Sequence, residues 1–139
     1  MIAFDADVLT HLLHGSPHVI QRAARFPADQ QAIPVVVADE ILRGRLNTVR
    51  QAEAGRARVS ISRAYSLLRS TIQHLHHFQI LEYHDAAEQL FQSWRQERIR
   101  VATHDMRIAA TCVVHSATLV SRNRRDFDLI PSLSVEYWD

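Results

Sequence analysis

The amino-acid sequence predicts an α/β fold, a three-layer sandwich around a mainly parallel central sheet. Short apolar runs typical of buried strands alternate along the chain with longer segments of helical periodicity. This alternation is typical of parallel strands joined by crossover helices. Acidic or polar residues follow several of the apolar runs directly, where ligand sites form in open parallel sheets.

The expected strands are short, and the last of them is expected at an edge of the sheet. They cover residues 1–4, 32–35, 79–83, 117–121 and 134–138. The expected helices lie between them, and the second begins after Ser16-Pro17, a frequent helix start. They cover residues 8–14, 17–26, 36–44, 60–78, 85–98 (capped by Asp85) and 103–115.

An arginine-rich segment at residues 45–58 precedes the amphipathic helix at 60–78. Together the two segments predict a helical hairpin inserted between strands. No repeat or linker divides the chain, so we expect a single domain over residues 1–139.

Composition limits the class of protein. With 47% hydrophobic and 22% charged residues, the chain is expected to fold and not to be disordered. No apolar stretch is long enough to span a membrane, and no signal-peptide pattern opens the chain, so a cytoplasmic location without membrane association is expected. Cys112 is the only cysteine, which excludes an internal disulfide and a multi-cysteine zinc site. The net charge of +1 is unlike that of broad nucleic-acid binders, although all 16 basic residues are arginine.

Several acids are expected at one edge of the sheet. Asp5 and Asp7 follow the first strand, and Glu40 lies just inside the helix after the second. Asp105 opens a later helix, and Asp126 follows the fourth strand. Carboxylates within about 4 Å of one another repel by a few kcal/mol, so such a cluster requires compensation.

A hard divalent cation or protonation would supply that compensation. Mg²⁺ or Mn²⁺ held by few carboxylates suits hydrolysis of a phosphodiester. Each acid taken alone is better explained as a helix cap or a solvated surface group, since Glu40 and Asp105 lie near helix N-termini. Four acids at one edge of the sheet favour a divalent-metal site over four separate caps. Arg107, within one turn of Asp105, is a candidate phosphate contact, although a solvated helix face explains it nearly as well.

Four segments of the sequence, in this order and spacing, resemble the PIN-domain ribonucleases, and most closely the VapC-type toxins of prokaryotic toxin–antitoxin pairs. They are Phe4-Asp5-Ala6-Asp7-Val8-Leu9, Ala38-Asp39-Glu40-Ile41-Leu42-Arg43-Gly44, Asp105-Met106-Arg107-Ile108-Ala109-Ala110 and the stretch from Leu119 to Phe127. The resemblance implies a PIN-like fold and a Mg²⁺- or Mn²⁺-dependent endoribonuclease. It also implies a cognate antitoxin protein as partner and a homodimer.

The resemblance assigns roles to individual residues. It implies that Asp5, Glu40, Asp105 and Asp126 are the catalytic acids, with Asp5 and Asp105 holding the metal. Asp7, Ser121 and Asn123 would lie near the substrate. Asp7 stands where these toxins more often have asparagine, and Ser121 replaces their usual threonine but keeps the hydroxyl group.

Two other functions remain as alternatives. A PIN-like module that binds RNA or protein without cleavage would be indicated by loss of one of the four acids, and none is lost. A metal-dependent phosphatase with a receiver-like fold would need a lysine beside a phosphorylated aspartate, and the chain has no lysine.

Overall fold

The computed structural model describes all 139 residues and contains one five-stranded sheet of order β3-β2-β1-β4-β5. Every neighbouring pair of strands is parallel, so the predicted mainly parallel sheet is in fact wholly parallel. The strands are β1 (Ile2–Phe4), β2 (Gln31–Pro34), β3 (Gln79–Leu81), β4 (Thr118–Ser121) and β5 (Val135–Tyr137).

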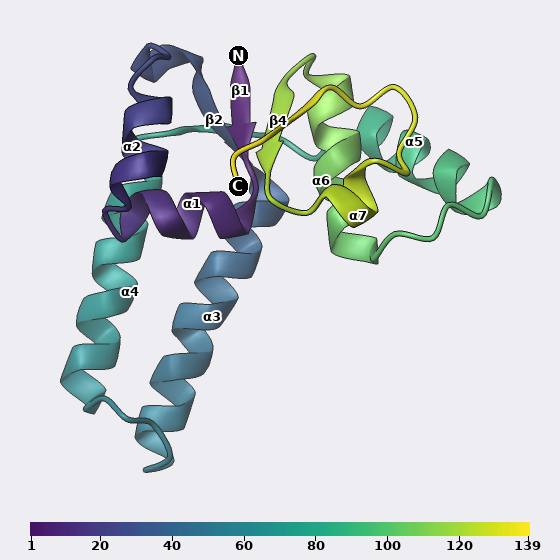
Figure 1. Ribbon diagram of the computed structural model, residues 1–139. Helices are drawn as coiled ribbons and strands as arrows, with labels where there is room; N and C mark the ends of the chain where they lie inside the picture. The colour runs from purple at the N-terminus through teal and green to yellow at the C-terminus, as the bar shows by residue number, and fades with distance from the viewer.

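Helices cover both faces of this sheet and complete the predicted three-layer α/β fold. In Figure 1, α1 and α2 lie on one side of the strands, and α5, α6 and α7 lie on the other. The helices are α1 (Ala6–Leu13), α2 (Pro17–Ala23), α3 (Val35–Glu53), α4 (Ile61–Leu75), α5 (Asp85–Gln96), α6 (Thr103–Val114) and α7 (Arg124–Phe127), with a 3₁₀ turn η1 (Ala28–Gln30) before β2. None of them combines the length and apolar character of a membrane-spanning segment.

The predicted helical hairpin is present as α3 and α4, which extend away from the sheet (Figure 1). The prediction that residues 45–58 form a segment separate from the preceding helix is wrong, because α3 continues without a break to Glu53. Buried Val49 and Ala52 of α3 pack against Ala64 of α4 in a small core of their own. This apolar stripe keeps the arginine-rich segment helical.

Several expected helix boundaries differ from the observed ones, and three of them have a bearing on the caps or on the site. The first helix begins at Ala6 and not at residue 8, because the Asp5 side chain accepts a hydrogen bond from the Ala6 amide and caps it. The second ends at Ala23, three residues early. Asp85 does not cap α5: His84 holds the cap position, and Asp85 lies in the first turn.

The core is built around β1, the middle strand of the sheet. Its residues Ile2, Ala3 and Phe4 are all buried. The Phe4 ring makes edge-to-face contacts with Phe78 and Trp138, with centroid distances of 6.1 and 5.8 Å. Burial of large apolar side chains of this kind stabilises the fold by about 1.5–3 kcal/mol each. The carboxyl end of β1 is thereby fixed at the centre of one edge of the sheet.

Candidate active site

Asp5 follows β1 directly and is the most buried of the acids, with 7% of its surface exposed. Its Oδ1 atom accepts a hydrogen bond from the Ala6 amide, and its Oδ2 atom accepts one from the Ser121 hydroxyl, both at 2.8 Å. Burial raises the pKa of Asp5. The two hydrogen bonds partly oppose this rise because they stabilise the carboxylate. The carboxylate is therefore held in one orientation at the sheet edge.

The hydrogen bonds continue from Asp5 to the other side of the site. Ser121 lies at the end of β4, is fully buried, and accepts a hydrogen bond of 3.0 Å from the Asn123 amide. The Asn123 side chain caps α7, and its Nδ2 group donates to Asp126 Oδ2 at 2.9 Å. Ser121 and Asn123 thus position Asp5 and Asp126, while their contact with a substrate remains a prediction.

Asp105 lies in the first turn of α6, where the helix dipole favours a carboxylate. Its pKa is nevertheless raised to about 6, first by burial and then by the negative charges of Asp5, Asp126 and Glu40. The charges of all three other acids act on this one group. The structure therefore brings together the four acids predicted from the sequence, from β1, α3, α6 and α7.

Glu40 lies on α3 and is the most exposed of the four acids. Burial raises its pKa, the charge of Asp5 raises it further, and His104 opposes both effects. His104 also lowers the pKa of Asp105, so this half-buried imidazole lies among the acids. The sequence offered no motif for His104 beyond its position before Asp105.

No cation of the chain forms an ion pair with the four carboxylates, and His104 only partly opposes the charge of Glu40 and Asp105. None of the four is within 4.0 Å of an arginine or histidine nitrogen, whereas other acids of the protein form such pairs. No group of three or more His, Cys, Asp or Glu residues lies close enough together to hold a metal ion as a preformed cage. An oxygen-only donor set without a counter-charge fits Mg²⁺ or Mn²⁺ bound through few carboxylates and several waters.

Asp7 differs from the four acids because it is already compensated. It is exposed, and its carboxylate lies 3.4 Å from His11 Nδ1 and 3.8 Å from the Arg122 guanidinium. Arg122 in turn lies 3.0 Å from His11 Nε2. Asp7 therefore belongs to a small charged cluster at the rim of the site.

Arg107 is not brought to the acids. Its guanidinium lies over the Phe91 ring of α5, 4.7 Å from the centroid, and its Nε is 3.9 Å from Glu88. Glu88 also accepts a hydrogen bond of 2.6 Å from the Tyr83 hydroxyl. The side chain is thus directed toward α5, and its predicted contact with a phosphate has no support in this arrangement.

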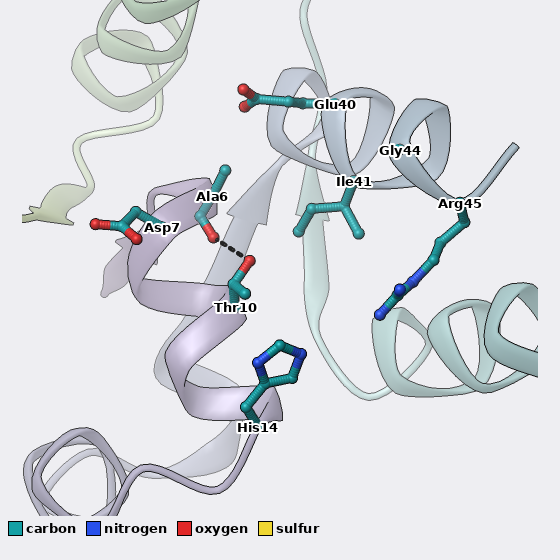
Figure 2. Close-up of a pocket in the computed structure, with 8 residues that line it drawn as sticks. All are labelled: Ala6, Asp7, Thr10, His14, Glu40, Ile41, Gly44 and Arg45. Atoms are coloured by element: carbon teal, nitrogen blue, oxygen red, sulfur yellow. Dashed lines mark hydrogen bonds between the residues drawn. The ribbon is translucent and has the colours of Figure 1, made fainter. Parts of the chain in front are cut away.

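A groove of about 530 Å³ runs from the acids along the facing surfaces of α1 and α3 (Figure 2). Its lining residues are spaced by about one helical turn on each helix. They are Ala6, Asp7, Thr10 and His14 of the first helix and its cap, and Glu40, Ile41, Gly44 and Arg45 of α3. Most of these residues were not singled out from the sequence. A spacing of three from Asp7 or of four from Glu40 would have pointed to Thr10 and Gly44, but not to which helix faces oppose each other.

Comparison with known proteins agrees with this geometry. A family model described as PIN domain matches residues 2–133. The protein described as Ribonuclease VapC1 of Rickettsia felis is 45% identical over 40 residues, which is 29% of this chain and 30% of that protein. The aligned segment therefore spans less than a third of this curated relative.

Solved structures resemble the chain over almost its full length. A toxin–antitoxin complex from Klebsiella pneumoniae has a TM-score of 0.74 at 24% identity, covering 100% of this chain and 98% of that one. VapBC2 from Rickettsia felis, bound to a DNA fragment from its promoter, has a TM-score of 0.75 at 20% identity and covers 100% of both chains. At these identities the likeness establishes the fold.

Proposed function

This chain belongs to the PIN domain family, and on that premise we propose that it is a divalent-metal-dependent endoribonuclease, the toxin of a toxin–antitoxin pair. The observation that carries the proposal is the meeting of four carboxylates from separate elements, none of which forms an ion pair with a cation of the chain. The short alignment with a protein described as a ribonuclease supports the same activity.

Asp5 and Asp105 would hold the Mg²⁺ or Mn²⁺ ion, and Glu40 and Asp126 would complete its shell directly or through water. When bound, such an ion supplies Lewis acidity toward a phosphodiester. The chain contributes orientation: Ser121 and the Ala6 amide fix the Asp5 carboxylate, and Asn123 fixes Asp126. Fixed carboxylates need little reorganisation when charge develops on the phosphate.

The test is cleavage of purified RNA by the full chain with Mn²⁺ and with a chelator. We expect fragments only with the metal, and we expect Asp5→Asn and Asp105→Asn to abolish them while circular dichroism shows an unchanged fold. Cleavage that continues at full rate in the chelator would contradict metal dependence. Full activity in either variant would contradict the role of that acid.

The proposed protein partner is an antitoxin that covers the acidic site. The solved structures that resemble this fold include one described as a toxin–antitoxin complex, from Klebsiella pneumoniae. Co-expression with the product of a short neighbouring reading frame should yield a stable complex in which RNA cleavage is suppressed. A complex that cleaves RNA as fast as the free chain would contradict this role of the partner.

A homodimer is proposed for the free protein on the basis of the family resemblance. Gel filtration with light scattering would measure its mass at micromolar concentration. A mass of one chain would contradict the dimer without affecting the proposed activity.

A further inference from the structure

Arg45 is a guanidinium without a carboxylate partner in the wall of the groove between α1 and α3. It lines the groove together with His14, and no carboxylate lies within 4.0 Å of it. Its Nε group donates a hydrogen bond of 2.9 Å to the Thr71 hydroxyl of α4. Thr71 is 97% buried, since only 3% of its surface is exposed, so it is a firm anchor. The rest of the guanidinium remains available to an anion.

The charges in this groove are separated along its length. Figure 2 shows Asp7 and Glu40 toward one end, and His14 and Arg45 toward the other. Glu40 and Arg45 are five residues apart on one helix, which corresponds to about 7.5 Å along its axis. Consecutive phosphates of a nucleic-acid strand have a similar separation. The two side chains leave α3 about 140° apart around its axis, so a strand that runs along the groove would carry a neighbouring phosphate from the acidic end toward Arg45.

Gly44 lies between these two ends, in the middle of α3. Glycine lowers the stability of a helix interior, so its presence there requires a reason. Its backbone is helical and not left-handed, and a Cβ atom built on it would meet no other atom within 4 Å. Neither backbone conformation nor packing within the chain therefore requires glycine. A ligand that approaches the α3 backbone closely would require it.

We propose that this groove binds the nucleotide next to the scissile phosphate of single-stranded RNA. Arg45, held by Thr71, contacts the flanking phosphate, and Gly44 leaves room for the strand. A volume of about 530 Å³ suits about one nucleotide, because sites of small organic ligands have this size. The inference rests on the proposed ribonuclease function and extends it to a substrate contact.

The test measures binding of a short fluorescein-labelled single-stranded RNA of mixed sequence to the full chain, in chelator so that no cleavage occurs. We expect Arg45→Gln to weaken binding about tenfold, because one charge-assisted contact is lost. The slope of log Kd against log salt should fall by about 0.7, as for one phosphate contact on a single strand. Gly44→Leu should weaken binding similarly by filling the groove.

Arg43→Gln is the matched control. Arg43 lies two residues from Arg45 on the same helix, but it does not line the groove and is paired with Asp39 at 2.8 Å. Both substitutions remove one positive charge from α3, so a general electrostatic effect would weaken binding equally in the two variants. We expect Arg43→Gln to bind RNA as the wild type does. Equal loss in both variants would overturn the subsite.

The subsite would also be overturned if Arg45→Gln and Gly44→Leu both bound RNA with wild-type affinity. Thermal melting would confirm that both variants are folded. The groove would then serve another occupant, such as a protein segment. Asp5→Asn separates this inference from the proposed function. If Asp5→Asn abolishes RNA cleavage but Arg45→Gln binds RNA as the wild type does, the proposed nuclease function stands and only the subsite is rejected. Absence of cleavage by the wild type rejects the nuclease, while the binding comparison still decides whether RNA occupies the groove.

Discussion

The Ser121 hydroxyl donates a hydrogen bond of 2.8 Å to Asp5 Oδ2, across two adjacent strands and 116 positions of sequence. The bond is buried, and it is one of only two hydrogen bonds to the Asp5 side chain. Hydrogen bonds to a charged group contribute about 1.5–3 kcal/mol each. This single contact therefore influences both the orientation and the ionisation of the central acid.

Ser121→Ala should lower metal-dependent RNA cleavage and destabilise the fold by about 1–3 kcal/mol, because a buried carboxylate oxygen loses its donor. The pKa of Asp5 should rise further, which shifts the pH profile of cleavage toward higher pH. Ser121→Thr keeps the hydroxyl group and should restore both the rate and the profile. The measurements are a pH–rate profile and a denaturant titration. An unchanged pH profile in Ser121→Ala would show that the contact does not act on the site.

Asp105→Asn should abolish cleavage and yet stabilise the metal-free protein at neutral pH. The charge of Asp105 is opposed by burial and by three neighbouring carboxylates, which raise its pKa to about 6. After allowance for solvent screening of this half-buried group, the gain is about 1 kcal/mol. Thermal melting in a chelator at pH 7 would measure it. A lower melting temperature would mean that the four charges do not repel each other as inferred.

Stability in a chelator should rise when the pH falls from 7 to 5. The folded-state pKa of Asp105, about 6, lies above its value in the unfolded chain. Between these two pKa values the folded state binds more protons, so the free energy of unfolding decreases as pH rises and levels off above about 6. Asp5 and Glu40 shift in the same direction. The Asp105→Asn variant is the control, and its slope over this pH range should be smaller.

Mn²⁺ should raise the melting temperature of the wild type at pH 7. Binding to the folded state alone stabilises it by about 2.7 kcal/mol at a hundredfold excess of metal over Kd. Asp5→Asn and Asp105→Asn should lose most of this shift, whereas Asp29→Asn, in the exposed 3₁₀ turn η1, should retain it. This readout does not depend on RNA. An equal shift in all variants would place the ion elsewhere.

Gly44 and Gly15 should respond differently to substitution by alanine. Gly44→Ala should stabilise the fold by about 0.5–1 kcal/mol, because α3 gains a better helix former and the new methyl group meets no atom. Gly15→Ala should destabilise it by about 1 kcal/mol, because Gly15 has a φ of 82°, which L-residues rarely adopt. Thermal melting distinguishes the two. Destabilisation by Gly44→Ala would point to a packing role for this glycine.

The sequence was sufficient to predict the elements that depend on local pattern. Apolar runs identify the strands, and the acids that follow them identify the edge at which Asp5, Glu40, Asp105 and Asp126 meet. The strand order β3-β2-β1-β4-β5 was not predicted, because several orders are compatible with alternating strands and helices. The length of α3 was missed, because residues 45–58 are mostly polar and the stripe that keeps them helical needs α4 as a partner.

The groove between α1 and α3 was also not predictable, and the reason is related. It exists because one face of α1 opposes one face of α3, and that relation is a property of tertiary packing. The direction of Arg107 was equally hidden, since its sequence distance from Asp105 does not reveal that Phe91 and Glu88 lie beneath it. The ends of parallel strands meet at a predictable edge, whereas the packing of one helix face against another was not predictable.

The place of β4 beside β1 has a consequence for the order of events during synthesis. Asp5 is made almost at once, but its partner Ser121 and the acid Asp126 come from the last fifth of the chain. A nascent chain therefore has no assembled acidic site until β4 inserts next to β1 and α7 forms. The acidic site therefore assembles only after residues as far along the chain as Asp126 have been synthesised.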